Sequence, residues 1–274
     1  MPTLEDLTGS PFLSYSSMDS YLTCGERYRL EKVIGVPQTK AWYLLGGSAV
    51  HEATELCDTQ GLPPSEAWPR AWQRQLDEAG DTSNLRAGGR ASKEWPAKEN
   101  GEWWAVNGLA MVQSWVRWRD SHIAQGWTLL EVEQAFEAKV GSAFVRGFID
   151  RTFANPNGEV VVVDIKTGVH TPASTLQLGI YRLGLLALPD GVQANLGAYW
   201  MSRKGELSEA KSLLHYTEEL VGNWLFKTQT AIEAEVFVPH VTSMCSSCSV
   251  APYCVAVGGT PPRIDSLINA TSHS

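Results

Sequence analysis

The sequence predicts an α/β fold, and three observations lead to this prediction. Large apolar residues recur at helical spacing in the first half of the chain, most clearly between Trp104 and Trp118. From residue 131 the period of the apolar residues changes from about 3.6 to about 2, which is typical of β-strands. A helical pattern over 172–188 then precedes a further strand. Strands that are separated by a helix in this way indicate a layered α/β domain.

The composition fits a folded globular protein. Of the 274 residues 43% are hydrophobic and 19% are charged, which is too apolar for a disordered chain. No apolar run approaches the roughly 20 residues that span a membrane, and "MPTLEDLTGS" lacks the features of a secretory signal, so we expect a cytoplasmic protein without a membrane partner. The net charge of -8 argues against non-specific nucleic-acid binding, although a local basic groove remains compatible with it.

Helices are predicted for most of the first half of the chain. One covers residues 14–34, a second begins at about Ser48 after a Gly-Gly pair, and a long third covers 102–124. The tryptophans of the third helix are interpreted as core residues. Residues 60–100 contain short helical pieces between the loop sequences "GLPP", "AGG" and "EWPAKENG". We therefore expect a helical insertion over about 60–130.

Strands dominate the chain after residue 131. The segments "EVEQAFEAKV", "AFVRGFIDRTFA" and "EVVVVDIKT" are predicted to be three successive strands, and 155–158 form a turn between the last two. A helix over 172–188, a strand "ANLGAYWMS" and a helix over 215–235 follow. The tail after residue 238 is rich in Cys, Ser, Pro and Gly and is predicted to be irregular.

Two acids and a lysine lie where the strand patterns end. Asp164 and Lys166 share one face of their strand, and the predicted turn brings Asp150 near Asp164. Carboxylates that converge repel each other unless a cation lies between them, and hard oxygen ligands suit Mg²⁺ or Mn²⁺. A lysine beside such an ion can position or activate a water, which predicts metal-assisted phosphodiester hydrolysis. The alternative is a surface ion pair at a strand end with an unrelated aspartate.

Three further features provide context for this cluster. His51 near the start of a helix can give an imidazole to a metal, although such a histidine alone is more often a core or surface residue. Gln177 and Tyr181 are four residues apart on the next predicted helix and share a face. Arg146 and Arg151 lie on either side of Asp150 in the sequence, and we expect them either to contact phosphates of a nucleic acid or simply to be solvated.

The order of these residues resembles that of a known family. In chain order the motifs are Gly47-x3-His51, Gly147-Phe148-Ile149-Asp150, Asp164-Ile165-Lys166 and Gln177-x3-Tyr181. This set resembles the PD-(D/E)xK nuclease superfamily, and most closely its RecB-like exonuclease branch. The resemblance implies a restriction-endonuclease-like core, which is a central mixed β-sheet flanked by helices. The second acid is Asp where Glu is frequent, a variation that the superfamily pattern allows.

The resemblance also implies a role for each matched residue. A divalent metal, Mg²⁺ or Mn²⁺, would be held by His51, by the acids Asp150 and Asp164, and by the carbonyl of Ile165. Lys166 would serve the attacking water. The remaining pair, Gln177 and Tyr181, would support the site and the DNA phosphates.

The five cysteines are distributed unevenly along the chain. Cys245, Cys248 and Cys254 have metal-ligand spacing, and Cys24 supplies a fourth thiolate if the two chain ends meet. Four thiolates suit zinc or an iron–sulfur cluster, and the alternative is uninvolved thiols. An odd number of cysteines in a chain with no export signal disfavours disulfides. Cys57 matches no ligand position and is predicted to be a buried thiol.

The cysteine pattern resembles the iron–sulfur nucleases of the RecB-like branch, which include CRISPR-associated exonucleases and the nuclease domains of recombination helicase–nucleases. This resemblance implies a [4Fe–4S] cluster that staples the chain ends together, with zinc as the less favoured occupant. Gly25 follows Cys24 where that branch commonly has Pro. We expect a single nuclease domain over 1–274, with the iron–sulfur segment formed by Cys24 and 245–254.

The resulting prediction is a divalent-metal-dependent DNA exonuclease that acts on single-stranded DNA or DNA ends. It would work in recombination or repair, in phage DNA metabolism or in CRISPR-type processing, with recombination or CRISPR-adaptation proteins as candidate partners. The alternative is a non-catalytic nucleic-acid-binding or assembly subunit that keeps the nuclease fold and the metal cluster.

Overall fold

The computed structural model describes residues 1–261, which fall into two compact units. The first unit combines both ends of the chain with the tip of a β-hairpin and consists of Met1–Thr39, Lys139–Val145 and the segment that begins at Glu218. The second unit consists of Lys40–Ala138 and Arg146–Thr217. That residues 1–274 form a single nuclease domain stays a prediction.

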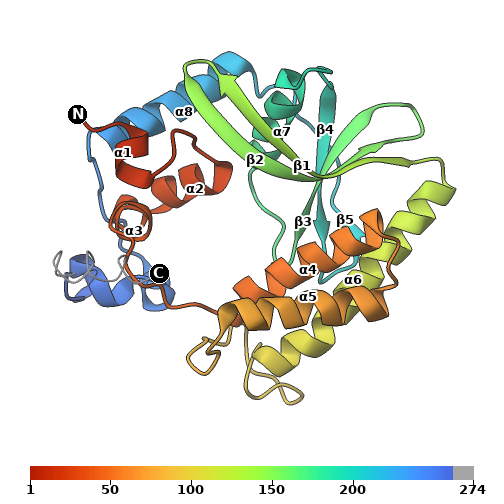
Figure 1. The fold of residues 1–274 in the computed structure, drawn as a ribbon, viewed down its shortest axis with the longest axis horizontal. Coiled ribbons are helices and arrows are strands. Elements are labelled where there is room, and N and C mark those ends of the chain that lie inside the picture. Colours follow the sequence, from red (N-terminus) through yellow and green to blue (C-terminus); the bar gives the residue numbers. More distant parts are fainter. Residues whose placement is uncertain (262–274) are drawn as a thin grey trace. The chain divides into compact units, whose positions relative to one another are not determined.

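One β-sheet of six strands is present in the described part of the chain (Figure 1). Its strand order is β1-β2-β3-β4-β5, and β6 also pairs with β4. The bounds are β1 Thr128–Val140, β2 Ala143–Ala154, β3 Val160–Lys166, β4 Ala194–Met201, β5 Glu206–Leu207 and β6 Lys211–Ser212.

The sheet is mixed, as predicted. β2 and β3 pair antiparallel with Arg151 opposite Val163. Their connection is the predicted tight turn, in which the backbone N–H of Gly158 donates to the carbonyl of Asn155 at 2.8 Å. β3 and β4 pair parallel, and they are joined through a helix, α7 Leu176–Ala187, because parallel neighbours need a crossover connection. The predicted central mixed sheet with flanking helices is therefore confirmed.

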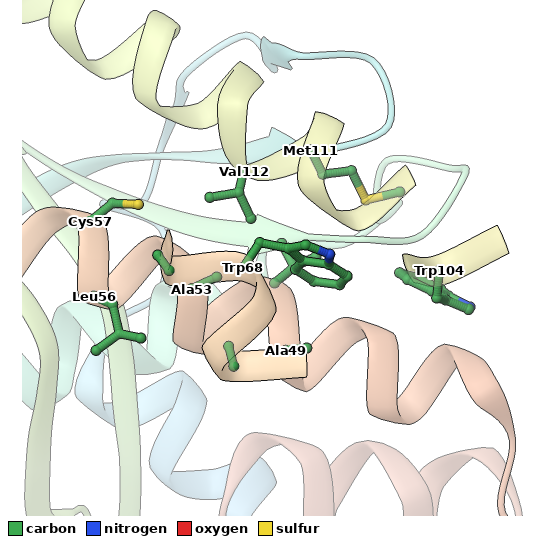
Figure 2. Packing of buried hydrophobic residues seen from close by; sticks show 11 residues of the cluster. Ala49, Ala53, Leu56, Cys57, Trp68, Trp104, Met111 and Val112 are labelled. Atoms are coloured by element: carbon green, nitrogen blue, oxygen red, sulfur yellow. The ribbon is translucent and has the colours of Figure 1, made fainter. Parts of the chain in front are cut away.

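Three long helices form a layer with its own hydrophobic core (Figure 1). They are α4 Trp42–Thr59, α5 Pro64–Ala79 and α6 Gly101–Ala124. Figure 2 shows Trp68 of α5 among buried side chains from all three helices, including Ala53, Met111 and Val112. The region 60–130 is thus mainly helical, as expected, and the prediction that its tryptophans are core residues is confirmed, since Trp104 and Trp115 are fully buried.

The helices α6 and α7 cover opposite faces of the sheet. Val163 and Ile165 of β3 pack with Trp115 of α6. Asp164, which lies between them in the strand, instead accepts a hydrogen bond from Gln177 of α7. Because successive strand residues point to opposite faces, the sheet is enclosed on both sides at this position. This enclosure makes the end of β3 a low-dielectric environment for charged groups.

The helix α4 begins six residues before the predicted start at Ser48, and its glycines are interior residues of the helix. A Cβ atom on Gly46 would lie 2.0 Å from the ring of Trp104. Likewise, a Cβ atom on Gly108 would lie 2.0 Å from the ring of Trp68. These glycines therefore permit indole rings to pack closely on helix backbones. The Gly46-Gly47 pair does not mark the start of the helix, contrary to the prediction.

The predicted helix over 14–34 is broken at Cys24. It consists of α2 Tyr15–Thr23, α3 Gly25–Tyr28 and the π-helical segment Arg29–Val33. The backbone of Cys24 is extended, with φ of -163°, and its Sγ accepts a hydrogen bond from the backbone N–H of His240 at 3.3 Å. A Cβ atom on Gly25 would lie only 2.9 Å from the backbone N of Val238. The break thus accommodates a C-terminal segment that runs against it.

The first unit is held together by contacts between distant parts of the chain. It also contains α1 Leu4–Thr8, α8 Glu218–Glu233 and the short 3-10 turns Ser243–Ser247, Ala251–Tyr253 and Val255–Val257. The backbone N–H of Leu4 donates to the Glu233 side chain at 3.0 Å, and the N–H of Thr39 donates to the carbonyl of Ser249 at 2.9 Å. Segments from the first 39 residues and from residues 218–261 therefore build one structure. Among the described residues, no helix combines the length and apolar character that crossing a membrane requires.

Candidate active site

The two acids and the lysine predicted from the sequence lie together on β2 and β3. Asp164 and Lys166 occupy the last residues of β3, and Asp150 lies in the neighbouring β2. The backbone N–H of Ile165 donates to Oδ2 of Asp150 at 2.7 Å, which fixes the first acid beside the second. Both carboxylates are buried, with 7% of Asp150 and 2% of Asp164 exposed. Burial at this level requires partners for the charges.

The lysine is held by a hydrogen-bond network from α7. Nζ of Lys166 lies 2.7 Å from Oδ2 of Asp164 and donates to Oε1 of Gln177 at 2.8 Å. The amide nitrogen of Gln177 donates to Oδ1 of Asp164 at 2.7 Å and to the hydroxyl of Tyr181 at 2.8 Å. The helical spacing of Gln177 and Tyr181 thus places both side chains beside the strand that carries the acid and the lysine. The structure brings all four residues together.

A group of potential metal ligands lies next to this network. His51 of α4, Glu133 of β1 and Asp150 each offer a ligand atom, and these atoms lie within 4.8 Å of one another. Nδ1 of His51 is 3.4 Å from Oδ2 of Asp150. Two carboxylates and an imidazole are a donor set that fits Mg²⁺ or Mn²⁺. Coordination by Asp164 and by the carbonyl of Ile165 stays a prediction.

Sequence reasoning missed Glu133. Its carboxylate contacts the buried guanidinium of Arg151 at 3.1 Å. Its backbone has a φ of 49°, a left-handed conformation that is rare for a residue other than glycine. Such strained residues concentrate at functional sites, where the surrounding structure holds them. The sequence signal was a glutamate inside a predicted strand, but the backbone conformation that directs its side chain depends on the folded sheet.

Burial controls the ionisation of the acids. Burial, followed by repulsion from Asp150, raises the pKa of Asp164 to about 6, although Lys166 acts in the opposite direction. Burial also raises the pKa of Asp150 and of Glu133, and in Glu133 the charge of Asp150 adds to the effect. Burial lowers the pKa of His51, which favours the neutral imidazole that binds metals. A cation among these groups would stabilise the ionised carboxylates and so oppose the effect of burial on the acid pKa values.

The prediction that Arg151 contacts nucleic acid is wrong. Its side chain is fully buried, and its Nε pairs with Asp58 of α4 at 2.5 Å. Other guanidinium nitrogens contact Glu133 and donate to Oγ1 of Thr54 at 3.1 Å, and the group lies over the ring of Trp115. The physical reason is that Asp58 is itself buried and needs a cation. Arg151 is therefore a support for the site.

Arg146 differs from Arg151 because its side chain is exposed. Its predicted contact with phosphates stays a prediction.

The four predicted ligand cysteines all lie in the first unit, and none forms a disulfide. Sγ of Cys24 and Sγ of Cys245 both contact the backbone of His240, at its N–H and its carbonyl respectively. Cys248 and Cys254 pack against a buried cluster of Leu30, Val36 and Val250. Metal binding by the four thiols and the staple between the chain ends stay predictions.

Cys57 lies in the second unit, away from these four in the chain. It is buried, as predicted, and burial raises its pKa to about 11. A thiol with this pKa stays protonated and has little reactivity.

The mixed sheet and the site together define the class of a metal-dependent nuclease, since buried acids beside a lysine at a strand end suit metal-assisted hydrolysis. A family model of the PD-(D/E)XK nuclease superfamily matches residues 12–255. The chain belongs to this superfamily, as the motifs predicted. Nucleases of this superfamily use divalent metals.

Similar proteins cover nearly the whole chain. The gene 69 protein of Mycobacterium phage D29 is 28% identical over 272 residues, which span 89% of this chain and 96% of that protein. The gene 69 protein of Mycobacterium phage L5 is 24% identical over 296 residues with the same coverage. The crystal structure of a candidate exonuclease from Eubacterium rectale superposes with a TM-score of 0.51, covering 87% of both chains at 10% identity. This last similarity supports the fold.

Proposed function

We propose that this protein is a divalent-metal-dependent DNA exonuclease that acts on single-stranded DNA or on DNA ends. The observation that carries the proposal is the convergence of Asp150, Asp164 and Lys166 with His51 at one end of the sheet. Glu133 joins this group. Family membership supports the reaction class, and the two similar phage proteins make phage DNA metabolism the setting that we favour. The protein would act in the cytoplasm, where such DNA is processed.

The metal would be held by the side chains of His51, Glu133 and Asp150, together with Asp164 and the carbonyl of Ile165. When bound, a divalent ion supplies Lewis-acid activation and offsets the negative charge that develops on the phosphate. The fit rests on the donor chemistry, since an imidazole and two carboxylates offer ligand atoms within 4.8 Å of one another.

The protein's own residues position the attacking water. Lys166 has three N–H donors, of which the hydrogen bond to Gln177 uses one, and the nitrogen also lies within ion-pair distance of Asp164. A remaining donor can orient a water toward the phosphorus atom. Gln177 holds both the lysine and the acid, and the hydroxyl of Tyr181 fixes the amide of Gln177. This network preorganises the lysine, which is what a positioned catalytic group requires.

The test is the substitution Lys166→Ala, with Lys93→Ala as a matched control on an exposed loop lysine. End-labelled single- and double-stranded DNA is incubated with each protein in Mg²⁺ and in Mn²⁺, and circular dichroism confirms the fold. We expect Lys166→Ala to reduce cleavage by about 10²–10⁴-fold, as for the removal of a proton-transfer or water-positioning group. Undiminished cleavage would overturn the assignment. Wild-type protein that binds DNA and metal without cleaving would favour the non-catalytic assembly subunit.

We also propose that Cys24, Cys245, Cys248 and Cys254 hold a [4Fe–4S] cluster that joins the two ends of the chain. The support is their presence in one unit and the shared contacts of two sulfurs with the backbone of His240. Iron and sulfide are measured in protein purified without oxygen, and a brown solution is expected. Cys248→Ser should lose the metal, whereas Cys57→Ala should keep it. A colourless protein with stoichiometric zinc would replace the cluster by a zinc site.

A further inference from the structure

A pocket of about 270 Å³ lies between α6 and the turn that follows β4. Both walls belong to the second unit. Three cationic side chains line the pocket, namely Arg117 of α6 and the consecutive residues Arg203 and Lys204. Among the described residues that line it, none is acidic. A cavity with cations and uncharged hydrogen-bonding side chains on its walls suits an anion.

The three cations have different roles in this pocket. Arg203 is fixed by two hydrogen bonds to the carboxylate of Glu99, at 2.7 and 2.9 Å, and its guanidinium lies 4.7 Å from the ring centroid of Trp103. The charge of Arg203 is therefore largely balanced by Glu99, and its role in the pocket is structural. Lys204 is half exposed and lies 3.7 Å from Glu206, a loose surface pair. The available positive charge comes mainly from Lys204 and from the exposed Arg117.

Ser202 provides a second and independent observation. It lines the pocket and is almost completely buried, because only 3% of its surface is exposed. Its Oγ has no hydrogen-bond partner among the described residues. Buried hydroxyl groups are nearly always hydrogen-bonded, and an unsatisfied one is costly. A phosphate oxygen in the pocket would supply the missing acceptor.

The pocket lies close to the catalytic strand. The backbone N–H of Ser202 donates to the carbonyl of Lys166 at 2.9 Å, and Nε of Arg203 donates to the carbonyl of Thr167 at 2.6 Å. Since β3 and β4 are parallel, Lys166 and the pocket lie at the carboxyl ends of adjacent strands. Ligands of open α/β sheets bind at these ends. The pocket is on the α6 side, whereas Gln177 contacts Asp164 from the α7 side.

We propose that this pocket binds a phosphate group of the nucleic-acid substrate other than the phosphate that is cleaved. The proposal rests on the proposed nuclease function. The shared chemistry is a phosphate mono- or diester, so the phosphate is either at the end of the strand or inside it. In both cases Arg117 and Lys204 neutralise the charge, and Ser202 donates a hydrogen bond. The pocket would hold the strand in register while Lys166 serves another bond of the same strand.

The test measures binding without cleavage. The double substitution Arg117→Gln and Lys204→Gln is compared with a control pair, Arg70→Gln and Lys93→Gln, whose side chains are exposed elsewhere in the second unit. All proteins also carry Lys166→Ala. The dissociation constant for fluorescent single-stranded DNA is measured over a range of salt concentrations, with phosphate or hydroxyl at the 5′ end and at the 3′ end.

The expected result is about tenfold weaker binding by the double variant and a smaller dependence of log K on log[salt], by about 0.7 for each phosphate that is no longer neutralised. If the double variant binds more weakly only to strands with a phosphate at one particular end, the pocket binds a terminal phosphate. If its binding to all strands is weakened equally, the pocket binds an internal phosphate. Ser202→Ala should weaken binding while the melting temperature stays unchanged or rises, because an unsatisfied hydroxyl is removed.

Two results would overturn the proposal. One is a double variant whose affinity and salt dependence equal those of the control pair. The other is weaker binding by the control pair of the same size. If the nuclease function fails instead, the protein without Lys166→Ala will bind DNA but not cleave it, so the two failures are distinguishable.

Discussion

The substitution Arg151→Met removes a buried cation from between two carboxylates, and we expect it to destabilise the fold strongly. Removing one partner of a buried ion pair leaves an uncompensated charge and typically costs about 3–5 kcal/mol. Asp58 would keep two partners, Arg119 at 2.5 Å and the indole N–H of Trp115 at 3.0 Å. The lower end of that range, about 3 kcal/mol, therefore applies. For a chain of this size it corresponds to a melting temperature lowered by about 6–12 °C.

The assay is thermal unfolding followed by circular dichroism at pH 7 in the presence of a chelator, with Arg70→Met on the exposed surface of α5 as the control. A destabilisation below about 1 kcal/mol would refute the reasoning, since it would mean that Asp58 and Glu133 need no buried cation. A second measurement distinguishes a structural role of Arg151 from a contact with DNA phosphates. Because Arg151 is buried and does not contact phosphates, the salt dependence of DNA binding by the folded variant should equal that of wild type.

Three further predictions concern the site and the helical layer. Glu133→Gln should weaken Mn²⁺ binding about tenfold or more in calorimetric titrations without DNA, and unchanged affinity would remove Glu133 from the ligand set. Asp164→Asn should stabilise the metal-free protein at pH 7 but not at pH 4, because the pKa of Asp164 is about 6 in the folded state and 3.8 in the reference state. The carboxyl group of Asp164 therefore contributes stability that is fully present below a pH of 3.8 and is lost as the pH rises through about 6. Urea unfolding with equal effects at both pH values would contradict this. Gly108→Ala should lower stability by about 1–3 kcal/mol because the new methyl meets the ring of Trp68, whereas Gly168→Ala, with open space around it, should be close to neutral in the same thermal scan.

The sequence predicted those parts of the site that short spacings determine. Asp164 and Lys166 are two residues apart in a strand, and Gln177 and Tyr181 are four apart in a helix, so each pair must share a face. The tight turn between β2 and β3 then brings Asp150 to Asp164. These relations depend on local geometry, which the sequence pattern reveals.

The parts that could not be predicted depend on contacts between residues far apart in the chain. Arg151 appeared available because nothing in its neighbourhood marks the buried Asp58 as its partner. The sequence pattern indicated a helix boundary at Gly46, but a glycine is needed there because the ring of Trp104, from another helix, leaves no room for a Cβ atom. Glu133 has its role through a left-handed backbone conformation inside a strand. In each case the deciding interaction exists only after the sheet and the helical layer have formed.

The first unit is built from opposite ends of the chain, and this arrangement has a consequence for synthesis on the ribosome. The hydrogen bond between Leu4 and Glu233 joins residues that are 229 positions apart, and Thr39 pairs with Ser249. The N-terminal helices therefore emerge long before the segments that complete them. Since domains fold as their sequence becomes available, the second unit, which ends at Thr217, can assemble its site first. A nascent chain would then acquire its acids and lysine before its cysteine-bearing end has left the ribosome.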